Sequence, residues 1–191
     1  MKLQLKCEAR LRNALQRHAR VLANAGLMVK WAGHAGDESS RMDLTWITGR
    51  VALGGGIWTI EHMSEIARAG ITHIIDMQIE FDDTPLAEPF GIQVLWNPTD
   101  DDFQPKQPEL FQRGVDFASQ ALEDEDSKVF IHCAAGIHRA AMMTLALLCS
   151  QGWELEDAMH AISSRRPVVD FAEVYVNSVE EFLQEQVKTG D

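Results

Sequence analysis

His132-Cys133-Ala134-Ala135-Gly136-Ile137-His138-Arg139 connects a short apolar segment, 128–131, with a longer apolar segment, 140–148. These two segments predict a buried strand followed by a buried helix, so the stretch forms a strand-to-helix turn. Backbone N–H groups at a helix start have no partner within the helix, and the helix dipole favours negative charge there. The stretch therefore predicts an anion site that contains a cysteine and an arginine six positions apart.

The side chains of this turn suit phosphate chemistry. A helix start and a neighbouring guanidinium favour the thiolate of Cys133, which could attack phosphorus and form a phosphocysteine. The planar guanidinium of Arg139 can hold two phosphate oxygens at once. Gly136 is where the backbone most needs conformational freedom. We expect backbone N–H groups to bind the remaining oxygens, namely those of Ala134, Ala135, Gly136, Ile137, His138 and Arg139.

The stretch resembles the signature of the cysteine-dependent protein phosphatases, in particular the small dual-specificity branch, which is HCxxGxxR followed by Ser or Thr. The resemblance extends over about Leu44 to Leu183. Residues 50–55 and 70–77 are similar to two strands of the family, and 165–167 resembles the segment before its last helix. This resemblance implies the cysteine-phosphatase fold and a metal-independent phosphomonoester hydrolase without a cofactor. It also implies that His132 orients the cysteine loop rather than touching the substrate.

Ala140 departs from the family pattern, because it stands where the family has a hydroxyl. The family uses that hydroxyl to stabilise the cysteine as it leaves the phosphocysteine. Losing one hydrogen bond to a charged group costs roughly 1.5–3 kcal/mol, so we expect slow breakdown of the intermediate. An alternative is a pseudophosphatase-like module that binds phosphate and turns over slowly.

A general acid must protonate the leaving group, and the loop 97–105 is its expected source. This loop follows the apolar strand 92–96, and the family carries its acid here. Counting from the cysteine without gaps gives Asp101, while Asp100 and Asp102 remain alternatives because a loop tolerates a one-residue slip. The other carboxylates then belong to turns or helix caps.

The variable positions of the cysteine loop contain no lysine or arginine. The rest of the chain is acidic, and together these two features argue against polyanionic substrates. His138 weakly opposes this argument when it is protonated. We therefore expect phosphotyrosine and/or phosphoserine/threonine of proteins as substrates, and no nucleic acid. A small phosphoester such as a sugar or inositol phosphate is a further alternative. The spacing of His132, Cys133 and His138 fits zinc badly, so no metal site is predicted.

Composition limits the architecture and the compartment. With 191 residues, 46% of them hydrophobic, the chain can bury one sizeable core. Three cysteines without paired spacing indicate a reducing compartment, so we expect a soluble, cytoplasmic protein without a membrane span.

Residues 1–30 have a net charge of +6, whereas the whole chain has −12. The predicted domains are a basic helix with its linker, 1–43, and a catalytic domain, 44–191. The basic helix either packs on its own acidic domain or binds a partner.

Strand-like and helix-like segments alternate after the linker. This predicts an α/β fold with a central, mainly parallel sheet flanked by helices on both faces and an N-terminal helical extension. The predicted strands are 45–52, 71–77, 92–96 and 128–132. The predicted helices are 59–69, 108–123, 139–151, 154–164 and 171–187. The cysteine loop then lies at the carboxyl end of a strand, where ligands of such sheets bind.

Overall fold

The computed structural model describes residues 41–189 of the chain. The predicted basic helix, and the question of whether it packs on its own domain, fall outside these residues. The five strands are β1 (Leu44–Trp46), β2 (Val51–Gly54), β3 (His73–Asp76), β4 (Gln93–Trp96) and β5 (Val129–His132). They form one sheet in the order β1-β2-β5-β3-β4, in which every pair is parallel except β1 with β2. The predicted mainly parallel sheet is confirmed.

The prediction of one strand over 45–52 is wrong, because the chain reverses direction between β1 and β2. The Thr48 hydroxyl accepts hydrogen bonds from the backbone N–H groups of Arg50 and Val51, at 3.2 and 3.0 Å. The Ile47 N–H donates to the Val51 carbonyl at 2.9 Å and closes the turn. Such local side-chain bonds offer the backbone an alternative to a continuous strand.

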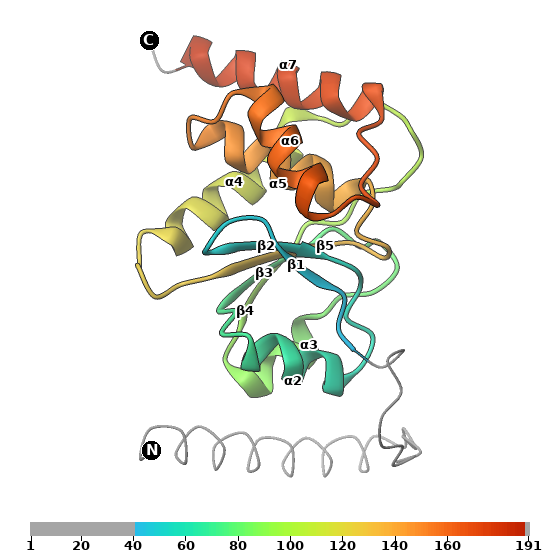
Figure 1. The fold of residues 1–191 in the computed structure, drawn as a ribbon, viewed down its shortest axis with the longest axis vertical. Helices are drawn as coiled ribbons and strands as arrows, with labels where there is room; N and C mark the ends of the chain where they lie inside the picture. The colour runs from blue at the N-terminus through green and yellow to red at the C-terminus, as the bar shows by residue number, and fades with distance from the viewer. Residues whose placement is uncertain (1–40, 190–191) are drawn as a thin grey trace.

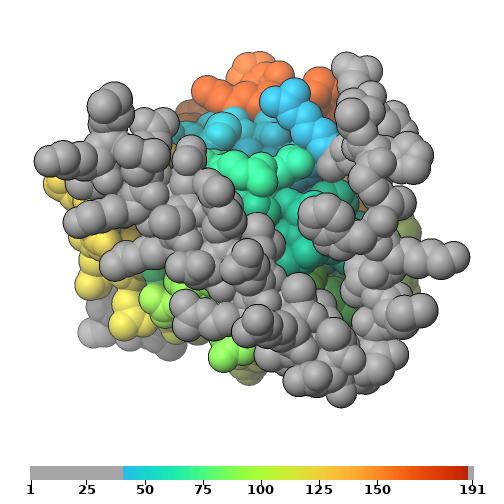
Figure 2. Space-filling model, turned by 90° about the horizontal axis from the view of Figure 1, so that it is seen from below, coloured from blue at the N-terminus to red at the C-terminus, as the bar shows by residue number. Residues whose placement is uncertain are grey.

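Helices cover both faces of the sheet (Figure 1). One face carries α4 (Pro108–Leu122), α5 (Arg139–Ser150), α6 (Leu155–Arg165) and α7 (Glu173–Thr189). The other carries α2 (Ile60–Arg68) and the short α3 (Thr84–Ala87), which is followed by the 3-10 helix η2 (Glu88–Phe90). Figure 2 views the molecule from the side of α2. The helices α3 and η2 were not predicted.

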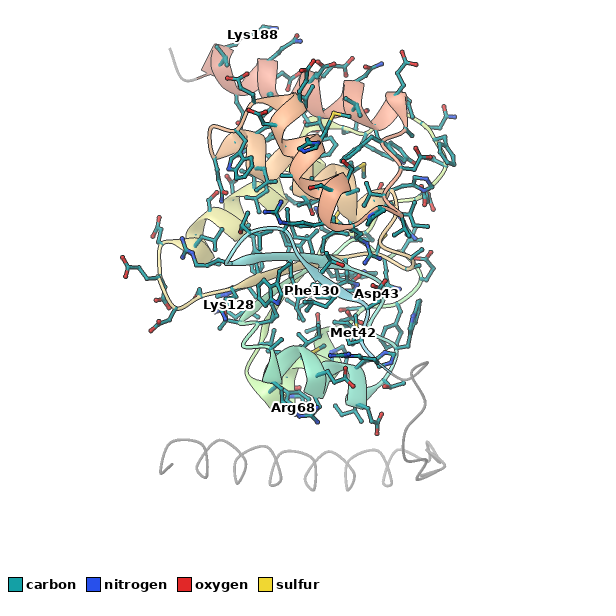
Figure 3. All side chains as sticks on the ribbon, in the orientation of Figure 1. Met42, Asp43, Arg68, Lys128, Phe130 and Lys188 are labelled. Carbon is teal, nitrogen blue, oxygen red and sulfur yellow. The ribbon has the colours of Figure 1, made fainter. Side chains whose placement is uncertain are left out.

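Alternate residues of the buried strand β5 face two separate cores. Val129 and Ile131 belong to the larger core under α4, α5 and α7, whereas Phe130 packs into the smaller core with α2. Figure 3 labels Phe130 on the sheet between these layers. This alternation follows from the period of two in a strand, and burial on both faces explains the continuous apolar run in the sequence.

The carboxyl ends of β2, β5, β3 and β4 lie at one edge of the sheet, because these strands are parallel. Four connections therefore start at this edge: 55–59, 77–83, 97–107 and 133–138. Open α/β sheets bind their ligands at this position. The cysteine stretch, the acidic loop and the segment after β3 thus meet in space, although they are far apart in sequence.

Candidate active site

The cysteine loop joins β5 to α5, as the sequence predicts. Cys133 is 1% exposed, and the Gly136 N–H donates to its Sγ at 3.3 Å. Gly136 has φ of 62°, and a Cβ there would lie 2.4 Å from the Gly54 carbonyl oxygen. Both the left-handed backbone and this close approach require glycine. The loop thus directs at least one N–H to the sulfur, an arrangement that suits an anion.

Arg166 holds this loop through two of its carbonyl groups, a role that sequence reasoning missed. Its Nε donates to the Gly136 carbonyl at 2.8 Å, and its Nη2 to the Ala135 carbonyl at 3.2 Å. The same guanidinium forms a two-bond pair with Asp43, at 2.7 and 2.6 Å, and Asp43 is labelled in Figure 3. Arg166 thus binds two carbonyls of the loop, while the Gly136 N–H donates to Cys133 Sγ.

Arg139 is 3% exposed at the start of α5 and is fixed by Glu80, which sequence reasoning also missed. Both terminal nitrogens of Arg139 donate to the Glu80 carboxylate at 2.9 Å, and Nη1 also donates to the Thr99 carbonyl at 3.2 Å. The hydrogen bond from Arg139 lowers the pKa of Glu80. Burial lowers the pKa of Arg139, but Glu80, Cys133 and Asp101 outweigh burial and raise it overall.

One edge of the Arg139 guanidinium remains available. Three of its five donors are used, which leaves the Nε–H and one Nη2 N–H without an acceptor among the described residues. These two donors lie on the same edge of the planar group, which matches two oxygens of a phosphate. Asp101 Oδ2 lies 4.0 Å from Nε, so the acidic loop reaches this edge.

The Asp101 carboxylate is held from two sides. The Tyr175 hydroxyl donates to Oδ1 at 3.0 Å, and His138 Nδ1 lies 3.0 Å from Oδ2. Burial raises the pKa of Tyr175 to about 12, so its hydroxyl stays a neutral donor. The Phe103 N–H donates to the same hydroxyl at 2.9 Å, and Phe103 has φ of 55°. This bond stabilises the bend that follows Asp101 in the loop.

The other two acid candidates lie in different surroundings. Asp102 pairs with Lys106 at 2.5 Å and accepts the Gln104 N–H at 3.1 Å. The hydrogen bond from Lys106 lowers the pKa of Asp102, which opposes a role as proton donor. Asp100 is exposed and has no hydrogen bond or ion pair within residues 41–189. Of the three, only Asp101 approaches Arg139.

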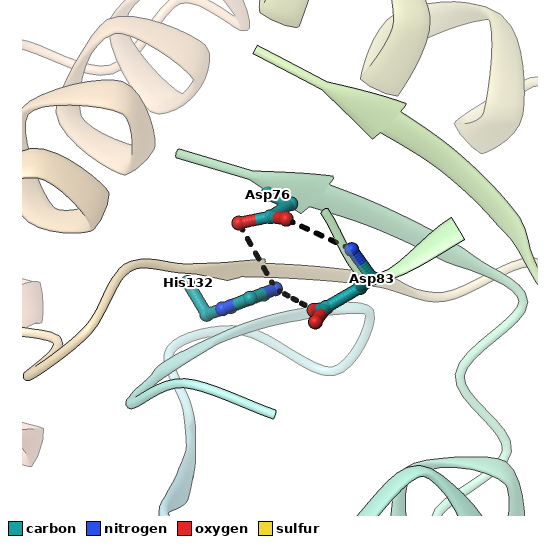
Figure 4. A group of neighbouring side chains, drawn as sticks. All are labelled: Asp76, Asp83 and His132. Atoms are coloured by element: carbon teal, nitrogen blue, oxygen red, sulfur yellow. Dashed lines mark hydrogen bonds and ion pairs between the residues drawn. The ribbon is translucent and has the colours of Figure 1, made fainter. Parts of the chain in front are cut away.

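His132 is fully buried on the α2 side of the sheet. Its Nε2 lies 2.8 Å from Asp83 Oδ2 and 3.7 Å from Asp76 Oδ1, as Figure 4 shows. The 2.8 Å separation of His132 Nε2 and Asp83 Oδ2 is that of an ion pair, but the two atoms do not meet the geometry of a hydrogen bond. The Phe130 ring stacks on the imidazole with centroids 5.2 Å apart.

Ligand atoms of Asp76, Asp83 and His132 lie within 4.8 Å of one another, a spacing that could hold a cation. Sequence reasoning missed both aspartates; the only signal is an aspartate at the end of an apolar strand.

Within residues 41–189, no helix combines the length and the apolar character needed to cross a bilayer.

Cys133 and Cys149 are both free thiols. Cys149 lies near the end of α5, half-buried, and burial raises its pKa to about 11. Cys149 therefore remains a neutral thiol at physiological pH and is no second nucleophile.

Comparisons with known proteins agree with this geometry. The family model of the dual specificity phosphatase catalytic domain matches residues 58–185. Dual specificity protein phosphatase 26 of Rattus norvegicus is 31% identical over 108 residues, which cover 55% of this chain and 51% of that protein. The chain thus spans about half the length of that curated relative.

Solved structures share the fold. PTPMT1 in complex with PI(5)P superimposes with a TM-score of 0.69 at 21% identity, covering 78% of this chain and 99% of that chain. Tk-PTP in its active form gives a TM-score of 0.65 at 22% identity, covering 74% of this chain and 97% of that chain. At these identities, the likeness shows the fold and leaves the substrate open.

Proposed function

The chain belongs to the dual-specificity phosphatase family, and from this membership we propose that it hydrolyses phosphomonoesters through a phosphocysteine intermediate. Cys133 is the nucleophile, Arg139 holds the phosphoryl group, and Asp101 is the general acid. The observation that carries this proposal is the unused donor edge of Arg139, which is held by Glu80 and approached by Asp101. A phosphate on this edge would be bound by two parallel N–H···O bonds.

The reaction has two displacements. In the first, the Cys133 thiolate attacks phosphorus, the P–O bond to the leaving group breaks, and Asp101 gives its proton to the leaving oxygen. In the second, the Asp101 carboxylate takes a proton from a water molecule, which attacks phosphorus. The S–P bond then breaks, inorganic phosphate leaves, and the thiolate is restored. Arg139 and the loop N–H groups stabilise the charge on the phosphoryl oxygens in both steps.

Phosphorylated protein side chains are the proposed substrates. PTPMT1 shares the fold and was solved in complex with PI(5)P, so a phosphoinositide is the alternative to test. The loop residues 134–138 carry no lysine or arginine, and Asp101 and Asp170 flank His138 at 3.0 and 3.4 Å. A second phosphate would meet these carboxylates rather than cations. A phosphotyrosine peptide is therefore expected to have a higher kcat/KM than PI(5)P.

The catalytic unit and its compartment are part of the same proposal. We assign catalysis to the predicted domain 44–191, together with Met42 and Asp43, which contact it through Glu65 and Arg166. A nucleophilic thiol must stay reduced, which suits the cytoplasm.

Asp101→Asn is expected to lower kcat/KM about 10²-fold, because kcat/KM reports the first step and the amide cannot protonate the leaving group. The loss should be larger with phenyl phosphate than with 4-nitrophenyl phosphate, whose leaving group needs less protonation. Steady-state rates with both esters check this, with Asp102→Asn as the matched control at close to the unmodified rate. A greater loss in Asp102→Asn or Asp100→Asn would assign the acid differently.

Ala140→Ser is expected to raise steady turnover about tenfold, because a hydroxyl would stabilise the leaving cysteine. The unmodified protein should then show a burst of about one aryl alcohol per active site, followed by a slower phase. Stopped-flow kinetics with an aryl phosphate in excess chelator measure both phases, and Ala141→Ser is the control. A loss of all turnover on adding chelator would contradict the metal-independent mechanism.

The second candidate function is a phosphate-binding module, which the lack of a hydroxyl at Ala140 favours. It predicts that no burst is seen, while an oxyanion such as tungstate still binds at the cysteine loop. The same stopped-flow experiment therefore decides between hydrolysis and binding.

A further inference from the structure

Large exposed apolar side chains gather at the edge of the sheet where the cysteine loop starts. Eight such side chains are exposed within residues 41–189, and six of them lie at this edge or on segments that reach it. These six form an apolar rim, which consists of Trp58, Ile79, Phe81, Trp96, Phe103 and Val168. The other two lie after α5 and near the end of α7. A concentration of exposed apolar side chains marks an interaction surface.

Two rings of the apolar rim are tied to segments that hold the phosphate site. The Trp58 and Phe81 rings are in contact, with centroids 6.4 Å apart. Trp58 packs on Gly56, where a Cβ would lie 2.7 Å from the indole, and the Gly56 N–H donates to a carbonyl of the cysteine loop at 3.1 Å. Phe81 directly follows Glu80, which binds Arg139. Both rings therefore lie on segments that contact the cysteine loop or its arginine.

A third ring of the apolar rim lies on the acidic loop. Phe103 is 51% exposed, and its ring meets the His138 ring edge-on with centroids 5.1 Å apart. The other contact of Phe103 is the Tyr175 ring, stacked at 5.7 Å. Asp101, two positions earlier, comes within 4.0 Å of Arg139 Nε. A phosphate on the free edge of Arg139 would thus have exposed aromatic side chains on two of the segments that approach it.

The segments that carry the apolar rim are acidic. Together with the cysteine loop and Arg139, the segments 55–59, 77–83, 97–107 and 166–172 contain seven Asp or Glu but three Lys or Arg. The three cations are buried and each is paired with a carboxylate; they are Lys106, Arg139 and Arg166. Two carboxylates remain exposed away from these cations, those of Asp100 and Asp170. Residues beside a bound phosphate would therefore meet negative charge, which favours lysine or arginine in the partner.

This charge also distinguishes a peptide from a lipid surface. Proteins that insert apolar side chains into a membrane surface usually add exposed lysine and arginine, which bind anionic headgroups. On the segments that carry the apolar rim, the lysine and the arginines are buried and the exposed charges are carboxylates. A cationic protein segment is complementary to this surface, whereas an anionic bilayer is not.

We propose that the apolar rim and its carboxylates determine substrate specificity, and that the preferred substrate is a protein segment with a large apolar residue and a lysine or arginine beside the phosphorylated residue. The proposal rests on the proposed function for the position of the phosphate. The rim side chains bind the neighbours of the phosphorylated residue and take no part in the displacement at phosphorus.

The first test compares four phosphotyrosine peptides of equal length with the unmodified protein. They carry leucine or alanine on both sides of the phosphotyrosine, and lysine or glutamate at the next positions outward. The leucine–lysine peptide is expected to have about tenfold higher kcat/KM than either the alanine–lysine or the leucine–glutamate peptide. The advantage of lysine over glutamate should shrink in about 0.5 M salt, because salt screens exposed charges, while the advantage of leucine should remain.

The second test assigns the preference for leucine to the apolar rim. The ratio of kcat/KM for the leucine–lysine and alanine–lysine peptides cancels any general loss of activity in a variant. Trp58→Ala is expected to lower this ratio about fivefold, because a large aromatic contact is lost. The matched control is Trp153→Ala, since Trp153 is also exposed but lies between α5 and α6. Its ratio should equal that of the unmodified protein.

The preference for lysine is assigned in the same way. Asp100→Asn should lower the ratio of kcat/KM for the leucine–lysine and leucine–glutamate peptides about threefold, because one exposed carboxylate is removed. Asp126→Asn is the control, since Asp126 is exposed in the turn between α4 and β5, at the opposite edge of the sheet. This control should leave the ratio unchanged.

Equal kcat/KM for the four peptides would overturn the inference, and so would an unchanged leucine ratio in a folded Trp58→Ala. Sedimentation with phosphatidylcholine vesicles that requires Trp58 would instead assign the apolar rim to a membrane surface. If Trp58→Ala does not fold, the peptide series with the unmodified protein still decides. Hydrolysis of none of the peptides, nor of an aryl phosphate, would contradict the proposed function. Calorimetric binding of the same peptides to Cys133→Ser would then measure the preference for flanking residues without turnover.

Discussion

Cys133→Ser is expected to lower turnover of an aryl phosphate by at least about 10⁴-fold. A serine hydroxyl is not ionised at neutral pH, so the attack on phosphorus loses its nucleophile. The anion site itself should remain, because the guanidinium of Arg139 and the loop N–H groups are unchanged. Tungstate affinity is therefore expected to stay within about threefold of the unmodified protein. Initial rates and calorimetric titration measure the two effects separately.

The matched control is Cys149→Ser. Cys149 lies in the same helix-loop unit, but it is near the far end of α5 and its pKa is raised by burial. Its replacement should leave turnover within about twofold. Full activity in Cys133→Ser would contradict the phosphocysteine mechanism. Loss of both turnover and tungstate binding would instead indicate that the substitution has damaged the loop.

Arg139→Lys is expected to lower kcat/KM about 10³-fold and to weaken tungstate binding strongly. The guanidinium of Arg139 can bind two anions at once. It donates to Glu80 through Nη1 and Nη2, and the edge formed by Nε and Nη2 remains available for phosphate. A lysine ammonium is a single point charge and cannot offer two parallel donors to each anion. Removing one donor to a developing oxyanion already costs about 10²–10³ in kcat.

The control makes the same substitution at an exposed arginine. Arg165 lies at the end of α6 and donates to the Ala161 carbonyl at 3.1 Å, away from the cysteine. Arg165→Lys should leave kcat/KM and tungstate binding close to those of the unmodified protein. If Arg139→Lys kept its tungstate affinity, phosphate binding would have to be assigned to the loop N–H groups alone.

Much of the fold was predictable because its signals are local. Continuous apolar runs identified β5 and α5, and the alternation of strands and helices predicted the mainly parallel sheet. The strand boundary near Thr48 was not predictable from hydrophobicity, because it depends on a hydroxyl that bonds to nearby backbone N–H groups. The short α3 lacks a full helical period, so periodicity could not reveal it.

The partners of the site residues were not predictable, because they come from distant parts of the chain. Glu80 and Arg139 are 59 positions apart, and Asp43 and Arg166 are 123 positions apart. A sequence shows the charge of each residue but not the register that joins them. The same holds for Asp76 and His132, which become neighbours only through the pairing of β3 with β5.

The sequence by itself was enough to predict Cys133 as the nucleophile and Arg139 as the phosphate-binding residue, because both belong to one continuous turn whose geometry is local. For the general acid it predicted Asp101 from its distance to the cysteine and left Asp100 and Asp102 as alternatives. Only the tertiary structure shows their different surroundings, since Tyr175, 74 positions away, donates to Asp101 while Lys106 pairs with Asp102. A loop has no periodicity of its own, so the elements packed against it decide where its side chains point.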